Sequence, residues 1–121
     1  MGSYMSRFTW LAALLFAFFQ GGANAVTVKG AKSCVEWAEL RQVSSTQKLS
    51  ELTTKFWIAG YLSGLAGAQA DILRNDPLKD LSNEKIYLFI DQYCTQQPDK
   101  SLQDATVELW LDIAKFKKRK P

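Results

Sequence analysis

The sequence contains no histidine, which removes the commonest catalytic base and the commonest metal ligand of proteins. Catalytic arrangements of the Ser–His and Cys–His types are therefore excluded. Only two cysteines are present, and two thiolates without a histidine do not complete a tetrahedral metal site. A glycine-rich phosphate loop is lacking as well, because the clustered glycines fall inside a helical pattern. The sequence predicts no metal, no cofactor and no enzymatic activity.

A long hydrophobic run is also missing. The longest uncharged apolar run, residues 8–19, covers twelve positions. As a helix it would extend about 18 Å, well short of a hydrocarbon core of about 30 Å. Arg7 precedes this run, and Ala23-Asn24-Ala25 follows it with the small residues that signal peptidase requires. These features predict a signal peptide over residues 1–25, cleaved after Ala25, rather than a membrane anchor, and so a mature chain that works outside the cytoplasm.

The two cysteines fall in the predicted mature chain, as Cys34 and Cys94. In an oxidising compartment they are expected to form a disulfide, and only one pairing is available. The closed loop of about 60 residues corresponds to a stabilisation of roughly 4 kcal/mol in the chain-entropy model. That is a large share of the stability of one small domain, whose hydrophobic core alone is marginal.

Basic charge is unevenly distributed along the chain. Residues 26–114 carry nine basic and twelve acidic side chains, whereas five of the last seven residues are Lys or Arg. A nucleic-acid-binding domain would spread its basic residues over a folded face, so no nucleic acid is expected as a partner. The basic tail over residues 117–121 is interpreted as a solvated helix end whose cations offset the helix dipole. Contact of this tail with a membrane or a partner is left open.

Helical patterns cover most of the mature chain, and no alternating strand pattern is found. Ser33 with Glu36, and Ser101 with Asp104, have the spacing of a capping box at a helix start. The predicted fold class is all-α, a small four-helix domain over residues 33–116 braced by one disulfide. A flexible N-terminus, residues 26–32, precedes it. The four predicted helices run over residues 33–41, about 50–74, 82–94 and from 99 or 101 to 116.

The second predicted helix is the longest and is expected to be central. Its apolar residues recur at three- and four-residue steps, the mark of an amphipathic helix. Several neighbours widen this stripe. The residues expected on the buried stripe are Leu52, Phe56, Ala59, Ala66, Ala70 and Leu73, widened by Ile58, Leu62, Leu65 and Ile72. Phe116 is expected on the buried face of the last helix, together with Leu102, Ala105, Leu109 and Ile113.

The same helix contains Gly60, Gly64 and Gly67, each of which costs about 0.8–1 kcal/mol relative to Ala in a helix interior. Gly60 and Gly64 lie one turn apart and leave a smooth groove. Two interpretations stay open: close packing of another helix of the same chain, or a groove for a partner.

An aromatic pair lies beside this groove. Trp57 and Tyr61 are one helical turn apart, on the same side as Gly64. An exposed Trp–Tyr pair beside a glycine notch is typical of a protein-binding hot spot, so these three residues are the candidate partner-binding site. The alternative is that both aromatic rings pack on the first or third helix.

Several motifs occur together: CVEW at residues 34–37, WIAGYLSG at residues 57–64, and a late Cys94 followed by Pro98. With the predicted signal peptide and a final amphipathic helix, this pattern resembles small periplasmic helical proteins of Gram-negative bacteria. That class includes the HdeA-like acid chaperones and the Rap-type immunity proteins of type VI secretion. The resemblance covers most of residues 33–116.

The resemblance implies a periplasmic protein-binding domain. An immunity-type protein would bind and block a secreted effector, often a cell-wall hydrolase. The alternatives are an HdeA-like chaperone that opens in acid through carboxylate protonation, and an accessory subunit of an envelope complex. The expected partner is a protein, effector or client; no stable membrane insertion is expected after cleavage, and a homodimer is left open.

Overall fold

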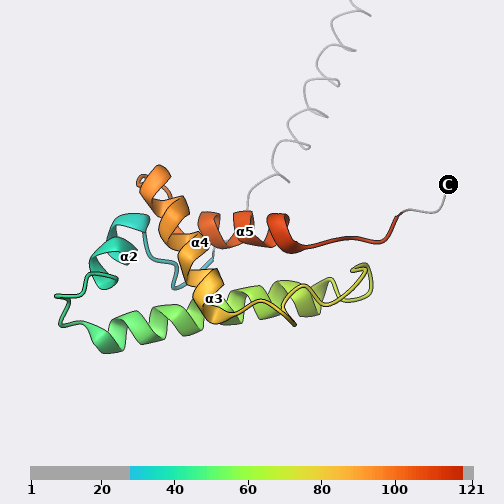
Figure 1. The fold of residues 1–121 in the computed structure, drawn as a ribbon, viewed down its shortest axis with the longest axis horizontal. Coiled ribbons are helices and arrows are strands. Elements are labelled where there is room, and N and C mark those ends of the chain that lie inside the picture. The colour runs from blue at the N-terminus through green and yellow to red at the C-terminus, as the bar shows by residue number, and fades with distance from the viewer. Residues whose placement is uncertain (1–27, 119–121) are drawn as a thin grey trace, which may run out of the picture.

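The computed structural model describes residues 28–118, and within this range the chain forms four α-helices and no strand (Figure 1). The predicted all-α class is thereby confirmed. The predicted signal peptide lies outside the described residues, as does the end of the basic tail. The helices are α2 (Cys34–Leu40), α3 (Lys48–Ala68), α4 (Asn83–Gln96) and α5 (Leu102–Ile113).

Local capping explains where three of these helices begin. The Ser33 hydroxyl accepts a hydrogen bond from the Glu36 N–H, and the Glu36 carboxylate accepts one from the Ser33 N–H. Ser101 and Asp104 form the same reciprocal pair at the start of α5. Ser82 accepts from Lys85 N–H at the start of α4. Both predicted capping boxes are confirmed, and each satisfies backbone donors that the first helical turn leaves without partners.

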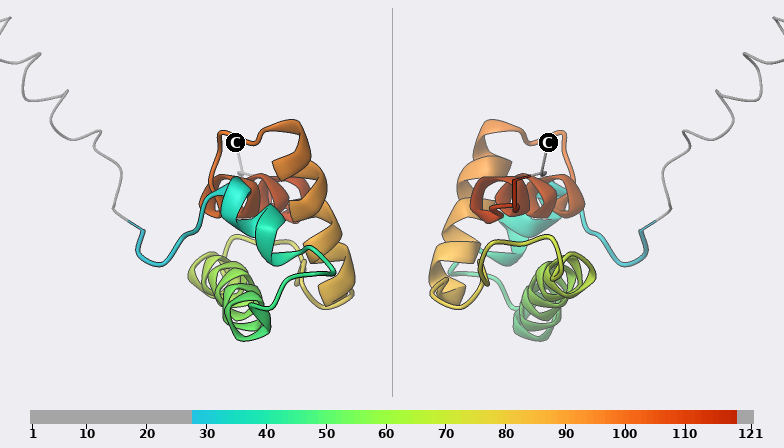
Figure 2. Two further views of the ribbon diagram at one scale, coloured as in Figure 1. Left: turned by 90° about the vertical axis from the view of Figure 1, so that its left-hand side faces the viewer. Right: turned by 90° about the vertical axis from the view of Figure 1, so that its right-hand side faces the viewer.

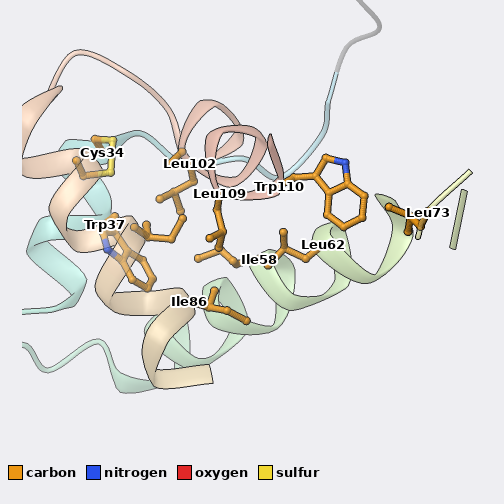
Figure 3. Packing of buried hydrophobic residues seen from close by; sticks show 12 residues of the cluster. Cys34, Trp37, Ile58, Leu62, Leu73, Ile86, Leu102, Leu109 and Trp110 are labelled. Carbon is orange, nitrogen blue, oxygen red and sulfur yellow. A yellow bond between two sulfur atoms is a disulfide. The ribbon is translucent and has the colours of Figure 1, made fainter. Parts of the chain in front are cut away.

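Helix α3 forms one side of the domain, and the other three helices lie together on the other side (Figures 1 and 2). The buried cluster fills the space between them. Ile58 and Leu62 on α3 are 0% and 1% exposed. They point towards α5, where Leu109 and Trp110 are also buried (Figure 3). The core therefore uses only one side of α3.

The disulfide between Cys34 and Cys94 is present, as predicted, and joins the first turn of α2 to the end of α4. The two Cα atoms are 5.0 Å apart, and both cysteines are buried in the core cluster. A second link holds the same end of α2 on α5: Cys34 N–H donates to Lys100 O, and Leu102 N–H donates to Lys32 O. The start of α2 is thus fixed on two helices at once.

Helix α3 ends at Ala68, so its predicted extension to Arg74 is wrong. The chain turns after Gln69, whose side-chain oxygen accepts a hydrogen bond from Trp110 Nε1 at 3.1 Å. Beyond the turn, Leu73 is buried and forms a single antiparallel bridge with Phe116. These contacts with the C-terminal segment replace the backbone bonds that a longer helix would make.

The buried stripe predicted for this helix is confirmed at Ile58, Leu62 and Leu73 and wrong at Leu52 and Phe56. Leu52 and Phe56 were expected inside, yet they are 48% and 66% exposed. The buried positions are Thr54, Ile58 and Leu62, one turn apart on the opposite side. Apolar residues lie all around α3, so their spacing alone is compatible with either face being buried. Ile72, another expected member, is 48% exposed beyond the helix end.

The last helix is shorter than predicted. It ends at Ile113, and the following residues are extended. Arg74 N–H donates to Lys115 O and Lys117 N–H donates to Ile72 O, both at 2.8 Å. Phe116 lies in this extended segment and is 41% exposed, so its predicted place on a buried helical face is wrong. The pairing stabilises an extended backbone here because it satisfies groups on both segments.

Candidate functional site

One side of α3 points away from the other three helices (Figures 1 and 2). The residues on it follow one another at three- or four-residue steps, which places them on one line along the helix. The large side chains are 48–75% exposed, and the small residues are exposed as well. We call this line the outward face of α3; it comprises Leu49, Leu52, Phe56, Gly60, Gly64 and Gly67.

The glycines of this face lie open. A Cβ atom added at Gly60, Gly64 or Gly67 would meet no atom within 4 Å among those of the other described elements. The interpretation that another helix of the same chain packs closely on these glycines is therefore wrong for residues 28–118. Since the described neighbours of α3 contact its other side, the groove faces solvent.

The outward face carries no charge along most of its length. No charged residue occurs from Phe56 to Ala70. At the C-terminal end of α3 the face continues into an open hollow of about 480 Å³. The hollow is lined by Ala66, Gly67, Ala70, Leu73, Asn75 and Asp76. The uncharged stretch of the face can receive an apolar side chain of another polypeptide, whereas Asn75 and Asp76 add polar groups to the hollow.

The structure brings Trp57 and Tyr61 together at one edge of the outward face. Their ring centroids are 5.2 Å apart and the rings are nearly parallel, at 25°. Both side chains are half-buried, and Trp57 packs against the core cluster. Trp57 Nε1 also donates a hydrogen bond to Lys29 O at 3.1 Å. The two rings therefore lie beside Gly64 and are less accessible than the fully exposed Trp–Tyr pair of a binding hot spot. Their role in partner binding stays a prediction.

The segment before α2 contacts Trp57 at Gly30, a position where the backbone conformation favours glycine. Gly30 has a φ of +84°, a left-handed conformation that L side chains rarely adopt. A Cβ atom at this position would lie 3.1 Å from Trp57 Nε1. Residues 29–30, part of the segment predicted to be flexible, thus contact α3 directly.

A second polar feature lies where α2, α3 and α4 meet, and we call it the Arg41 cluster: Arg41, Asp91, Glu51, Lys55 and Trp37. Arg41 Nε and Nη2 donate to the two oxygens of Asp91, at 3.1 and 2.9 Å. Trp37 Nε1 donates to the same carboxylate at 2.8 Å. Glu51 pairs with Lys55 Nζ at 3.0 Å and with Arg41 Nη1 at 3.4 Å. Charge-assisted bonds of this kind are stronger than neutral ones, so the cluster ties three helices together.

The charges within the Arg41 cluster shift its acid–base behaviour. The hydrogen bond from Lys55 lowers the pKa of Glu51 from its ordinary value, and Arg41 acts in the same direction. The hydrogen bond to Asp91 raises the pKa of Arg41. The charged side chains of the cluster pair with one another. This pairing indicates a structural junction, since it presents no free charge for a ligand.

Within residues 28–118, no three His, Cys, Asp or Glu side chains lie close enough together to hold a metal ion. Every fully buried side-chain nitrogen or oxygen there has a hydrogen-bond partner. Among the described helices, none has both the length and the apolar character needed to cross a bilayer. The feature of this part of the chain that best fits a binding role is the outward face of α3.

Sequence reasoning missed the two most exposed members of the outward face as candidates. Leu49 was not named, and Phe56 was placed on the buried stripe, although Phe56 and Trp57 face different directions around the helix and one of the two was expected near the surface. The signal that points to both is their register: they lie on the same line as Gly60, Gly64 and Gly67, which carry no side chain to fill a core. The hot-spot prediction found Gly64 but placed the emphasis on the aromatic rings beside it.

Comparisons of the chain with protein-family models, with curated proteins and with solved structures found no match. The resemblance to Rap-type and HdeA-like proteins therefore stays a prediction from the motifs.

Proposed function

We propose that this chain is a non-catalytic protein-binding domain of the periplasm that inhibits a secreted effector, as immunity-type proteins do. The observation that carries this proposal is the outward face of α3, an uncharged surface that the fold leaves uncovered. Contiguous exposed apolar residues on a small soluble domain are typical of a contact surface for another protein.

The shape of the face supports a protein partner. Phe56 stands out of the surface, and Gly60 beside it leaves the backbone accessible. An aromatic side chain at the centre of an interface is a frequent source of binding energy, and a glycine notch admits a side chain of the partner. The buried disulfide supports the proposed compartment, because disulfides persist where the environment is oxidising.

The test is inhibition of the effector by the purified, oxidised chain over residues 26–121. The candidate effector for this test is the product of the neighbouring gene, assayed at pH 7. We expect stoichiometric inhibition and a complex that survives gel filtration. Replacing Phe56→Ser should weaken the complex at least tenfold, which is the loss of one interface anchor.

Leu111→Ser is the matched control for this test. Leu111 is 62% exposed, similar to Phe56, but lies on α5. Its replacement should leave inhibition unchanged. Absence of any complex, or equal affinity of the Phe56→Ser variant and the unchanged chain, would contradict the proposal.

A second candidate function, an acid-stress chaperone, is favoured by one specific observation. The Arg41 cluster depends on ionised carboxylates to join α2, α3 and α4. Protonation of Glu51 in strong acid would weaken its pairing with Arg41 and Lys55, loosen these helices and expose apolar surface. This candidate requires prevention of client aggregation and strong ANS binding at pH 2–3, both absent at pH 7.

A further inference from the structure

The outward face of α3 has its large residues in the first half and its glycines in the second half. This order is complementary to itself when a second helix runs in the opposite direction. With the two helices centred between Phe56 and Gly60, Phe56 of one copy faces Gly60 of the other. Leu52 then faces Gly64 in the same way. We propose that the outward face of α3 pairs with the same face of a second copy of this chain, antiparallel, about a two-fold axis.

The hollow at the end of α3 fits this register. In the same alignment Leu49 of one copy faces Gly67 of the other. Gly67 lines the hollow of about 480 Å³, together with Ala70 and Leu73 and with the polar residues Asn75 and Asp76. Leu49 is 75% exposed in the single chain, so the pairing buries part of this side chain against Gly67 and Ala70, which the fold itself does not.

Room for the facing side chains is the second argument. Helices pack with axes about 8–10 Å apart, and the distance depends on the side chains at the contact. Gly60 and Gly64 have no side chain, and no other described element lies within 4 Å of a Cβ placed there, so they leave room for Phe56 and Leu52 of the second copy within this range. The two-fold axis repeats every such contact on both sides of the interface.

Charge at the two ends selects the antiparallel direction. Lys48 begins α3, and Asp71 follows three residues after its end; both are exposed. An antiparallel pair brings Lys48 of one copy near Asp71 of the other at each end, whereas a parallel pair would bring like charges together. Within one chain Lys48 Nζ also lies 3.8 Å from Glu51 Oε2, and Lys117 Nζ donates to Asp71 O, so the contribution of this charge pair is small. The helix dipoles also favour the antiparallel arrangement.

The area that the outward face can bury indicates how strong the dimer is. The outward face extends over nineteen residues, or about 28 Å, and a strip about 10 Å wide buries on the order of 600 Å² in total. This is less than the 1,200–2,000 Å² of a standard interface, so a weak dimer is expected, formed between about 10 μM and 1 mM. The inference rests on the proposed function in one respect, because the second copy occupies the surface that the effector would bind. An effector that binds with higher affinity than the second copy would displace it.

The test is sedimentation equilibrium of the oxidised chain over residues 26–121, from 10 μM to 1 mM, with no effector present. We expect the average mass to rise from one chain towards two. Gly60→Phe and Phe56→Gly should each weaken the dimer at least tenfold, because one fills the notch and the other removes the side chain that enters it. When both replacements are combined in one chain, the large side chain and the glycine exchange positions and again face each other. The dissociation constant of the dimer should then return to within about threefold of its value for the unchanged chain.

Two controls separate pairing from folding. Neither Gly60 nor Phe56 is enclosed by the described fold, so far-UV circular dichroism of these variants should match that of the unchanged chain. Leu111→Glu, on the exposed side of α5, should leave the dimer unchanged.

A chain that stays monomeric to 1 mM overturns the inference, as do assemblies larger than two chains. A dimer that both single variants retain, or that the combined variant fails to restore, overturns the register. These outcomes are distinct from failure of the proposed function, because an obligate monomer that still inhibits the effector leaves that proposal intact.

Discussion

The two faces of α3 have similar apolar side chains but opposite surroundings. On the inner face Ile58 and Leu62 are 0% and 1% exposed, and they pack against α5. On the outward face Leu49 and Phe56 are 75% and 66% exposed. Folding explains the inner residues completely, because burial of each contributes roughly 1.5–3 kcal/mol. It gives no reason for the outer ones, and this difference is what indicates a binding role for the outward face.

The inner face depends on the helices that cover it, so the largest expected effect comes from the disulfide that holds α2 on α4. Replacing both cysteines, Cys34→Ser with Cys94→Ser, should lower the free energy of unfolding by about 4 kcal/mol. Urea denaturation followed by circular dichroism measures this loss. Dithiothreitol should lower the stability of the unchanged chain and leave the double variant unaffected. Equal denaturation midpoints for the unchanged and double-variant chains would show that the bond contributes nothing.

A matched pair of leucines on α3 tests the comparison itself. Leu62→Ala on the inner face should lower the free energy of unfolding by about 3 kcal/mol, through lost burial and the cavity left behind. Leu52→Ala, at a position 48% exposed, should cost less than about 1 kcal/mol. Similar losses at the two sites in urea denaturation would mean that both faces support the fold.

The outward glycines give an effect of opposite sign. Gly60→Ala should raise the free energy of unfolding by up to about 1 kcal/mol, because alanine is the better helix former and its Cβ meets no other element. The thermal unfolding midpoint at low protein concentration measures the gain. A loss of stability would show that the chain itself closes over this groove. Gly30→Ala is the contrasting control and should destabilise, since its φ is +84°.

The smallest expected effect is a pH dependence of the free energy of unfolding, which arises from Glu51 on α3. Lys55 and Arg41 lower the pKa of Glu51 below its ordinary value of 4.5 in the folded chain. The stabilisation by this carboxylate is therefore fully present above pH 4.5 and is lost as the pH falls through the lower folded-state pKa. Glu51→Gln should flatten this part of the stability curve. An unchanged pH profile in that variant would remove Glu51 from the explanation.

The local features of the fold could be predicted from the sequence because their signals are short in range. Ser33 with Glu36 and Ser101 with Asp104 specify helix starts within four residues of each other. The disulfide followed from the presence of only two cysteines and the predicted compartment. These inferences need no knowledge of how the helices are arranged.

The arrangement of α3 could not be predicted in the same way. Its apolar residues lie on all sides, so the spacing leaves the choice between the Phe56 side and the Ile58 side open. That choice is made by long-range contacts, such as the bond from Trp110 Nε1 to Gln69, 41 residues away. The Arg41–Asp91 pair, 50 residues apart, has no signature in the sequence either.

The most direct test of the outward face is a calorimetric titration of the effector with the Phe56→Ala variant, beside a urea denaturation of the same sample. We expect the affinity to fall at least tenfold while the free energy of unfolding changes by less than about 0.5 kcal/mol. An unchanged affinity, accompanied by a loss of several kcal/mol in stability, would show that Phe56 supports the fold and that partners bind elsewhere.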